Sequence, residues 1–362
     1  MSVAQSDVES SLKAWIDPNL GKDLVSAKMV KKIEVEGDKV RVGVALGYPA
    51  AGFHAELKET LAGKIKADTG ASEVNVEVVT DIVSHSVQKN LKPMPGVKNI
   101  IAVASGKGGV GKSTTAVNLA LALAAEGARV GILDADIYGP SQPLMLGLSG
   151  QPEVEDGKRM IPKVAYGIQS ISIGYLVDED QPMIWRGPMV TGALQQLLKD
   201  TKWDNLDYLL IDLPPGTGDI QLTLAQQIPV SGAVIVTTPQ DIALLDAQRG
   251  LRMFEQVSVP VLGLVENMSV HICSNCGHAE PIFGEGGGTK MAQKYGTELL
   301  GSLPLDINIR LNADSGHPTV VADPDGQPAR VYKEIARKMA ARLALKAKDY
   351  SSRFPTISVV ND

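Results

Sequence analysis

The sequence predicts an α/β protein in which a doubly wound parallel sheet follows a small α/β domain. Short apolar runs alternate with helical patterns over most of the chain, as expected for parallel strands joined by helices on both faces of a sheet. A glycine-rich turn lies between the first of these runs and the next helix, where phosphate-binding loops occur. Residues 1–80 carry a pattern of their own and can close a separate small core.

The small α/β domain is expected over residues 1–80. After a short helical pattern, two runs of alternating apolar and polar residues flank the turn Gly37–Asp38 and predict a hairpin. Apolar residues spaced by four then predict one face of a helix, and a third alternating run predicts a third strand. The apolar positions are Val30, Ile33, Val35, Val40, Val42, Val44 and Leu46 in the hairpin, Phe53, Leu57, Leu61 and Ile65 in the helix, and Val74, Val76 and Val78 in the third strand.

The second domain is expected over residues 99–348. Residues 81–98 lack a period and contain the Ser, Asn, Pro and Gly residues typical of a linker, and residues 349–362 form a tail. Five apolar runs in this domain predict parallel strands, and ligands bind at the carboxyl ends of such strands. These runs are Ile100–Ala104, Val130–Asp134, Tyr208–Asp212, Ala233–Thr237 and Val261–Val265.

The turn after the first run has the pattern G-x-x-x-x-G-K-[ST] of a P-loop NTPase, and a helix is expected from Ser113 to Glu126. Glycines let backbone N–H groups converge on phosphate oxygens at a helix N-terminus, where the macrodipole adds positive charge. Lys112 is expected on the β- and γ-phosphates and the Ser113 hydroxyl on Mg²⁺. The residues predicted to bind the nucleotide here are Gly106, Gly108, Gly109, Val110, Gly111, Lys112, Ser113 and Thr114.

Lys107 is a second lysine at the start of this loop. One loop lysine is enough to hold a nucleotide, so Lys107 needs another explanation. We interpret Lys107 as a cation supplied in trans, pointing away from the phosphates of its own loop. The alternative is a solvated surface lysine.

Two of the predicted strands end in acidic residues. Asp136, just after the second run, could orient the water that attacks the γ-phosphate, because phosphoryl transfer depends mostly on positioning and electrostatics. An acidic turn or helix cap is the alternative. Asp212 ends an apolar run as in the second NTPase motif, where the carboxylate faces Mg²⁺ through water. The loop Asp212–Asp219 contains two glycines that leave room to change conformation with the γ-phosphate.

The composition argues against several classes of function. The 362 residues are 44% hydrophobic, so the chain can bury a sizeable core, and its formal net charge of −6 without a dominant basic cluster argues against a nucleic-acid partner. No apolar run approaches the roughly 18 residues of a membrane span. Met1–Asp17 lacks the charge and hydrophobicity of a secretory signal. We expect a cytoplasmic protein.

Cys273 and Cys276 are the only cysteines, and such a close pair builds no disulfide framework. Two thiolates on a tight turn provide half of a four-cysteine metal site, and a two-fold dimer would supply the other half. Four thiolates suit an iron-sulfur cluster or zinc. A local zinc site with His271 and His278, a redox pair and a purely structural pair are the alternatives.

The motifs together resemble the Mrp/ApbC family of iron-sulfur cluster carrier ATPases, within the MinD-like deviant phosphate-loop class. The resemblance covers about residues 95–345. The N-terminal unit is similar to a small domain of iron-sulfur assembly factors, but Ala50, Ala51 and Gly52 stand near the position where many relatives have a cysteine. The matching segments are G-K-G-G-V-G-K-S-T, D-A-D-I-Y-G-P-S, W-R-G-P-M at Trp185–Met189, D-L-P-P-G-T-G-D, E-N-M-S at Glu266–Ser269 and the C-x-x-C pair.

The resemblance implies an ATP-hydrolysing homodimer that binds a bridging 4Fe-4S cluster at Cys273 and Cys276 and passes it to apo-proteins. In this family pattern, Lys107 reaches the nucleotide of the other subunit, Asp136 orients water, and Asn267 recognises adenine. Its expected partners are a second copy, apo iron-sulfur clients and the iron-sulfur assembly machinery. The small domain is not expected to act through a thiol.

Two other functions fit some of the motifs. In a MinD-like positioning switch, ATP would drive dimerisation and membrane attachment without a metal, and a C-terminal helix with an apolar stripe and a basic face would touch the membrane. We expect that helix to dock on the sheet instead. In a plain binding module, the nucleotide would be structural and turnover negligible. The stripe consists of Val331, Ile335, Met339 and Leu343.

Overall fold

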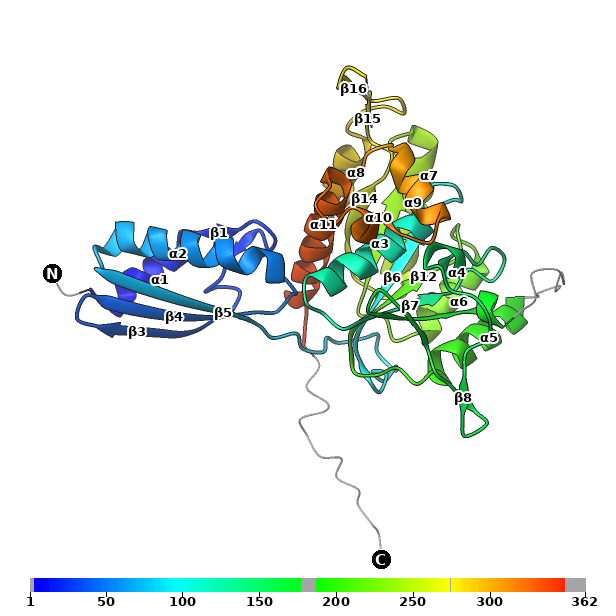
Figure 1. The fold of residues 1–362 in the computed structure, drawn as a ribbon, viewed down its shortest axis with the longest axis horizontal. Helices are drawn as coiled ribbons and strands as arrows, with labels where there is room; N and C mark the ends of the chain where they lie inside the picture. Colours follow the sequence, from blue (N-terminus) through cyan, green and yellow to red (C-terminus); the bar gives the residue numbers. More distant parts are fainter. Residues whose placement is uncertain (1–2, 177–186, 274, 349–362) are drawn as a thin grey trace, which may run out of the picture.

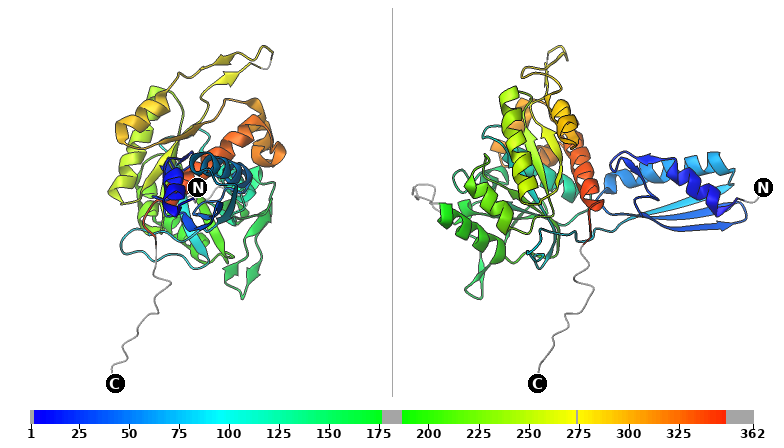
Figure 2. Two further views of the ribbon diagram at one scale, coloured as in Figure 1. Left: turned by 90° about the vertical axis from the view of Figure 1, so that its left-hand side faces the viewer. Right: turned by 180° about the vertical axis from the view of Figure 1, so that it is seen from behind.

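The computed structural model describes residues 3–176, 187–273 and 275–348, and shows a small domain projecting from one side of a larger one, next to α11 (Figures 1 and 2). The Trp185–Arg186 part of the W-R-G-P-M segment and the tail lie outside the described residues. The helices are α1 Gln5–Lys13, α2 His54–Thr69, α3 Lys112–Ala125, α4 Gln142–Met145, α5 Gly187–Lys199, α6 Asp219–Gln227, α7 Asp241–Gln256, α8 Gly287–Tyr295, α9 Ile307–Asp314, α10 Thr319–Ala322 and α11 Gln327–Ala344.

The small domain packs α1 and α2 against a three-stranded sheet in the order β3-β4-β5. β3 pairs with β4 antiparallel through the turn after Glu36, and β4 pairs with β5 in parallel. The helix face inferred from four-residue spacing is confirmed, because Leu57, Leu61 and Ile65 are buried. The strands are β1 Ile16–Asp17, β2 Lys22–Asp23, β3 Val30–Glu36, β4 Lys39–Leu46 and β5 Glu73–Thr80.

The larger domain contains an eight-stranded sheet in the order β10-β11-β7-β12-β6-β13-β14-β17, parallel except for the β10 edge. The doubly wound parallel sheet expected from the sequence is therefore confirmed. Its strands are β6 Val97–Ser105, β7 Val130–Asp134, β10 Lys163–Ala165, β11 Ile168–Ser172, β12 Leu206–Asp212, β13 Gly232–Thr237, β14 Val261–Glu266 and β17 Leu299–Ser302, and three of these, β10, β11 and β17, were not anticipated. Two short hairpins complete the fold, β8 Val154–Glu155 with β9 Arg159–Met160 and β15 His271–Ile272 with β16 Ala279–Glu280.

Helices cover both faces of the large sheet and bury two apolar cores. One core contains α3 and α11 and continues into the small domain, whereas the other contains α5, α6 and α7. Ile335, Met339 and Leu343 of α11 are fully buried, so the apolar stripe of this helix packs inside the protein as expected. None of the described helices has the length and apolar character needed to cross a membrane.

Glu126, directly after α3, ties the two domains together. Its carboxylate accepts a hydrogen bond from the Gly52 backbone N–H at 2.9 Å and pairs with Arg337 of α11 at 2.8 Å. The side chain is only 3% exposed. The helix that begins at the phosphate loop therefore ends at the small domain.

Candidate functional site

The phosphate loop connects β6 to α3, in the strand-to-helix context that its sequence pattern requires. Gly109 and Gly111 both have φ of 80°, a backbone conformation that glycine adopts without strain. A Cβ atom at Gly106 would lie 2.2 Å from the Asp246 carbonyl carbon of α7. The loop is therefore fixed both by its own glycine conformations and by close packing against a neighbouring helix.

The loop is open on its outer side. A Cβ atom at Gly109 would meet no atom within 4 Å, and one at Gly108 would first meet Pro215 at 3.9 Å. Behind the loop, α3 runs for 14 residues and directs its N-terminal dipole at the same place. This geometry fits phosphate oxygens.

Lys112 and Ser113 lie together with Asp212 at the carboxyl end of the sheet. The Lys112 ammonium pairs with the Asp212 carboxylate and also donates to the Ser113 hydroxyl at 3.1 Å. Lys112 is 6% exposed and Asp212 is fully buried. The structure therefore brings together the three side chains that the sequence assigned to phosphate and Mg²⁺ binding.

Asp134 lies beside Asp212 because β7 and β12 pair in a register that places the two residues opposite each other. Its Oδ2 atom accepts hydrogen bonds from the Ser141 and Gln142 backbone N–H groups at 3.0 Å and from the Ser172 hydroxyl at 3.2 Å. Burial, and then the Asp212 charge, raise the pKa of Asp134 to about 7. Two carboxylates thus share one buried, lysine-compensated site.

Gln142 and Ser172 were not assigned to this site from the sequence. The Gln142 side chain donates to Asp212 Oδ2 at 2.9 Å and to the Ser113 carbonyl at 3.1 Å, so it links α4 to the loop. Ser172 is the last residue of β11. This strand was not predicted because its sequence, Ile-Gln-Ser-Ile-Ser, contains three polar residues. The pairing of β11 with β7 places Ser172 opposite Asp134.

Asp136 is half-buried just beyond Asp134, to whose Oδ1 atom its backbone N–H donates at 3.1 Å. Burial raises the pKa of Asp136. Lys107 is also half-buried, and among the described residues none forms a hydrogen bond or ion pair with its ammonium group. Both side chains thus belong to the loop region, at its periphery.

A glutamine at the start of α6 and a backbone hydrogen bond to the end of β6 hold the loop Asp212–Asp219. The Gln221 side chain donates to the Pro214 carbonyl at 2.8 Å and accepts from the Gly218 N–H at 2.6 Å. The Gly216 N–H donates to the Ser105 carbonyl at 3.0 Å, next to the phosphate loop. Asp219 begins α6, where a negative charge is favourable.

Asn267 contacts the phosphate loop itself. Its side-chain amide donates to the Val110 carbonyl at 2.9 Å, and its backbone N–H donates to the Thr237 carbonyl at 2.7 Å. A Cβ atom at Gly111 would lie 2.2 Å from the Asn267 Nδ2 atom. The sequence did not anticipate this support of the loop.

Cys273 and Cys276 lie at the tip of the β15–β16 hairpin, which extends from the larger domain (Figures 1 and 2). The Cys273 backbone N–H donates to the His278 carbonyl at 2.9 Å, and the Gly277 N–H donates to the Cys273 carbonyl at 2.8 Å. Cys273 is partly exposed and Cys276 is exposed, and both are free thiols. Hydrogen bonds from the Asn275 and Cys276 backbone N–H groups lower the pKa of Cys273, which favours the metal-binding thiolate.

Among the described residues, the cysteine pair has no further metal ligand beside it. Within residues 3–176, 187–273 and 275–348, no three His, Cys, Asp or Glu side chains are arranged to hold a metal ion. The His271 ring contacts the Leu305 carbonyl at 3.2 Å. Among the described residues, the side chains of His271 and His278 are therefore not gathered with the cysteines as the alternative zinc site would require. The described residues place the pair between the strands of a hairpin, whereas a thioredoxin-like redox pair would open a helix.

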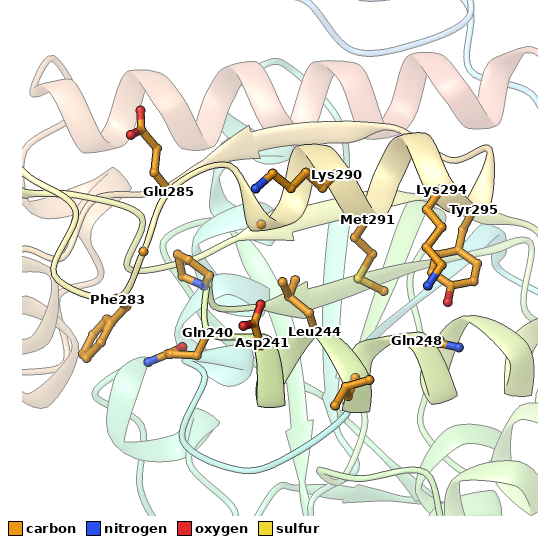
Figure 3. A pocket seen from close by; sticks show the side chains of 14 residues that line it. Gln240, Asp241, Leu244, Gln248, Phe283, Glu285, Lys290, Met291, Lys294 and Tyr295 are labelled. Atoms are coloured by element: carbon orange, nitrogen blue, oxygen red, sulfur yellow. The ribbon is translucent and has the colours of Figure 1, made fainter.

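A groove of about 500 Å³ lies between α7 and α8 (Figure 3). Gln240, Leu244 and Gln248 line one side, and Lys290 and Met291 line the other. None of its lining residues belongs to the phosphate-loop cluster described above. The sequence patterns gave no indication of this groove.

Comparisons with known proteins agree with both parts of the chain. Residues 96–340 match the family described as NUBPL iron-transfer P-loop NTPase, and residues 5–78 match the family described as iron-sulfur cluster assembly protein. The iron-sulfur cluster carrier protein of Escherichia coli K12 is 53% identical over 337 residues, which span 93% of this chain and 91% of that protein. The carrier of the same description from Pseudomonas fragi is 61% identical and covers 74% of this chain and 94% of its own length.

A solved structure is similar as well. The nucleotide-binding protein from Archaeoglobus fulgidus, in complex with ADP, is 40% identical and aligns with a TM-score of 0.56. The alignment covers 64% of this chain and 90% of that chain.

Proposed function

Because the chain belongs to the family of NUBPL iron-transfer P-loop NTPases, we propose that it is an ATPase that carries a 4Fe-4S cluster across a homodimer and transfers it to apo-proteins. One observation carries this proposal. The hairpin that presents Cys273 and Cys276 continues the chain from β14, and the residue after β14, Asn267, contacts the phosphate loop. The short segment from Asn267 to Cys273 thereby connects the cysteine pair to the phosphate loop.

The donor groups fit ATP with Mg²⁺. The Ser113 hydroxyl and the Asp212 carboxylate are hard oxygen ligands of the kind that Mg²⁺ prefers, and Asp212 is next to Lys112. Bound Mg²⁺ would neutralise charge on the β- and γ-phosphate oxygens. Lys112 would hold these oxygens, and the loop N–H groups would orient them.

Hydrolysis then requires a positioned water and a cation for the charge that develops. Asp136 lies beyond the buried carboxylates with a raised pKa, and we assign it the task of orienting water. Lys107 is half-buried at the start of the loop, and we assign its ammonium group to the nucleotide of the partner copy. Asn267 would contact adenine with the part of its amide that does not bind Val110.

The cluster is the cargo. Each chain supplies two thiolates on an exposed tip, so a second copy related by a two-fold axis would complete four ligands. The lowered pKa of Cys273 supports binding of a soft metal as thiolate. The exposure of the tip suits release of the cluster to a client, and two free thiols suit a reducing compartment such as the cytoplasm.

The test is anaerobic reconstitution followed by iron, sulfide and zinc analysis with visible and EPR spectra. We expect about four irons and four sulfides per dimer in the wild type. The double variant Cys273→Ala/Cys276→Ala should lack them, while a variant at the neighbouring histidine, His278→Ala, should keep them. Zinc alone, or a metal content that the double variant retains, would exclude the carrier function.

A further inference from the structure

Two consecutive residues at the end of β14 contact two different parts of the molecule. Glu266 is the last residue of the strand, and Asn267 directly follows it. The Asn267 amide holds the Val110 carbonyl of the phosphate loop at 2.9 Å. The Glu266 carboxylate accepts a hydrogen bond from the Gly288 N–H at the start of α8 at 2.6 Å.

These contacts matter because two segments connect the cysteine hairpin to the rest of the domain. We call the segment before the hairpin its first root and the segment after it its second root. The first root, from Glu266 to His271, is bound to the segment after β17. The Leu303 N–H donates to the Glu266 carbonyl at 2.8 Å, and the Ser269 N–H donates to the Leu303 carbonyl at 2.9 Å. The second root runs from β16 into α8, so the first turn of α8 determines where it ends.

The start of α8 is packed closely against the strand ends. A Cβ atom at Gly288 would lie 2.9 Å from the Glu266 carboxylate, and one at Gly287 would lie 2.7 Å from the Pro239 carbonyl oxygen. Glu266 is 4% exposed, and its negative charge faces the positive end of the α8 dipole. Its Oε1 atom also accepts a longer hydrogen bond from the Ser302 hydroxyl, at 3.4 Å.

Beyond its first turn, α8 borders the groove of about 500 Å³ that separates it from α7. Figure 3 shows Lys290 and Met291 of α8 facing this space, with Phe283 and Glu285 of the second root at one end. The contact of Glu266 with Gly288 therefore fixes the end of α8 that adjoins the hairpin.

We propose that Glu266 is a positioning residue that locks the second root of the cysteine hairpin to the strand end supporting the phosphate loop, so that nucleotide binding changes the accessibility of Cys273 and Cys276. This inference rests on the proposed function, since it takes the phosphate loop as the nucleotide site. It adds a physical route between that site and the cysteines within one chain. Asn267 makes the contact with the phosphate loop, and Glu266 makes the contact with the start of α8.

The absence of any other cysteine makes the hairpin directly measurable, because every thiol signal comes from its tip. The rate of reaction with an aromatic disulfide reagent is measured on the cluster-free protein without nucleotide, with Mg-ADP and with a non-hydrolysable Mg-ATP analogue. We expect the rate in the wild type to change about fivefold or more between the nucleotide-free and analogue-bound forms. Glu266→Ala should lose this change while it still binds the analogue.

Two further variants distinguish positioning from general packing. Glu266→Gln keeps an acceptor for the Gly288 N–H and should retain most of the response. Glu126→Ala removes another buried carboxylate that accepts a backbone N–H, but at the far end of α3, and should leave the response intact. Melting curves of all variants show whether each is folded.

The outcomes separate this inference from the proposed function. A response that persists in Glu266→Ala, or that disappears equally in Glu126→Ala, would overturn the positioning role. A wild type that binds nucleotide without any change in thiol rate would also overturn it and leave the ATPase and carrier proposal standing. A wild type that binds no nucleotide would overturn both.

Discussion

The phosphate-loop end of the sheet and the cysteine hairpin are built in opposite ways. Around the loop, Lys112, Asp134 and Asp212 are buried and connected by hydrogen bonds, so the groups for one nucleotide site lie within one chain. At the hairpin, Cys273 and Cys276 are accessible and the described residues offer no third ligand. The difference teaches that one chain gathers its phosphate-loop groups into a buried cluster but leaves its cysteine pair exposed, and under the proposed function a second copy completes the metal site.

The largest effect that would sharpen this comparison concerns Lys107. Lys107→Ala should lower ATP turnover by about 10²–10³-fold, as removal of a group that stabilises transition-state charge does. Nucleotide affinity should change much less, because Lys112 of the same chain still contacts the phosphates. Steady-state phosphate release and equilibrium binding measure the two effects.

Mixing variants tests whether Lys107 acts in trans. A dimer of one Lys107→Ala chain and one Lys112→Ala chain contains one site with both lysines, so the mixture should recover activity that neither variant has alone. Lys290→Ala, an exposed lysine at the α7–α8 groove, serves as the control with unchanged turnover. Normal turnover in Lys107→Ala would contradict the role, and the absence of recovery in the mixture would contradict its action in trans.

A second effect concerns packing at the loop. Gly106→Ala would place a methyl group 2.2 Å from the Asp246 carbonyl carbon, and the resulting shift should destabilise the fold by about 1–3 kcal/mol. Gly108→Ala is the matched control for stability, because its first neighbour would be 3.9 Å away. Denaturant unfolding of the two variants measures the difference. Equal stability would show that the loop moves away from α7 without cost.

The buried carboxylates should make stability depend on pH. The pKa of Asp134 is raised to about 7, above the unfolded value, so the folded state binds more protons at mildly acidic pH. Its contribution is therefore fully present below the unfolded pKa and is lost as the pH rises toward 7, by at most about 1.4 kcal/mol per pH unit.

Asp134→Asn removes this titration. Relative to the wild type, the variant should gain stability as the pH rises from 5 to 7, which denaturant unfolding at several pH values measures. Asp136→Asn is the control for a less buried carboxyl group in the same turn. A difference between Asp134→Asn and the wild type that is constant with pH would contradict the raised pKa.

The smallest effect is expected at the hairpin. Because Cys273 and Cys276 are accessible, the cluster-free Cys273→Ala/Cys276→Ala variant should unfold within about 0.5 kcal/mol of the wild type. Its denaturant midpoint compared with that of Gly106→Ala shows the contrast between the two regions. A loss comparable to that of Gly106→Ala would mean that the thiols support the fold.

Much of the fold followed from sequence because β6, β7, β12, β13 and β14 each contain a continuous apolar run. The glycine pattern fixes the turn between β6 and α3. β11 and β17 were missed because they are short and contain Ser or Gly, and only their pairing in the sheet defines them. For the same reason Ser172 was not assigned to the site, and Gln142 was not assigned because it belongs to α4, a helix of only four residues. The contact of Glu266 with Gly288 depends on tertiary packing across 22 positions, which no local pattern reports.

The central claim is that each chain holds one nucleotide site and half of a cluster site. Native mass spectrometry of the anaerobically reconstituted protein, with a non-hydrolysable Mg-ATP analogue, counts chains, nucleotides and clusters in the same ion. We predict a dimer that carries two nucleotides and one 4Fe-4S cluster, and a dimer without cluster for the double cysteine variant. A monomer that retains a cluster, or a dimer with one cluster on each chain, would contradict the claim.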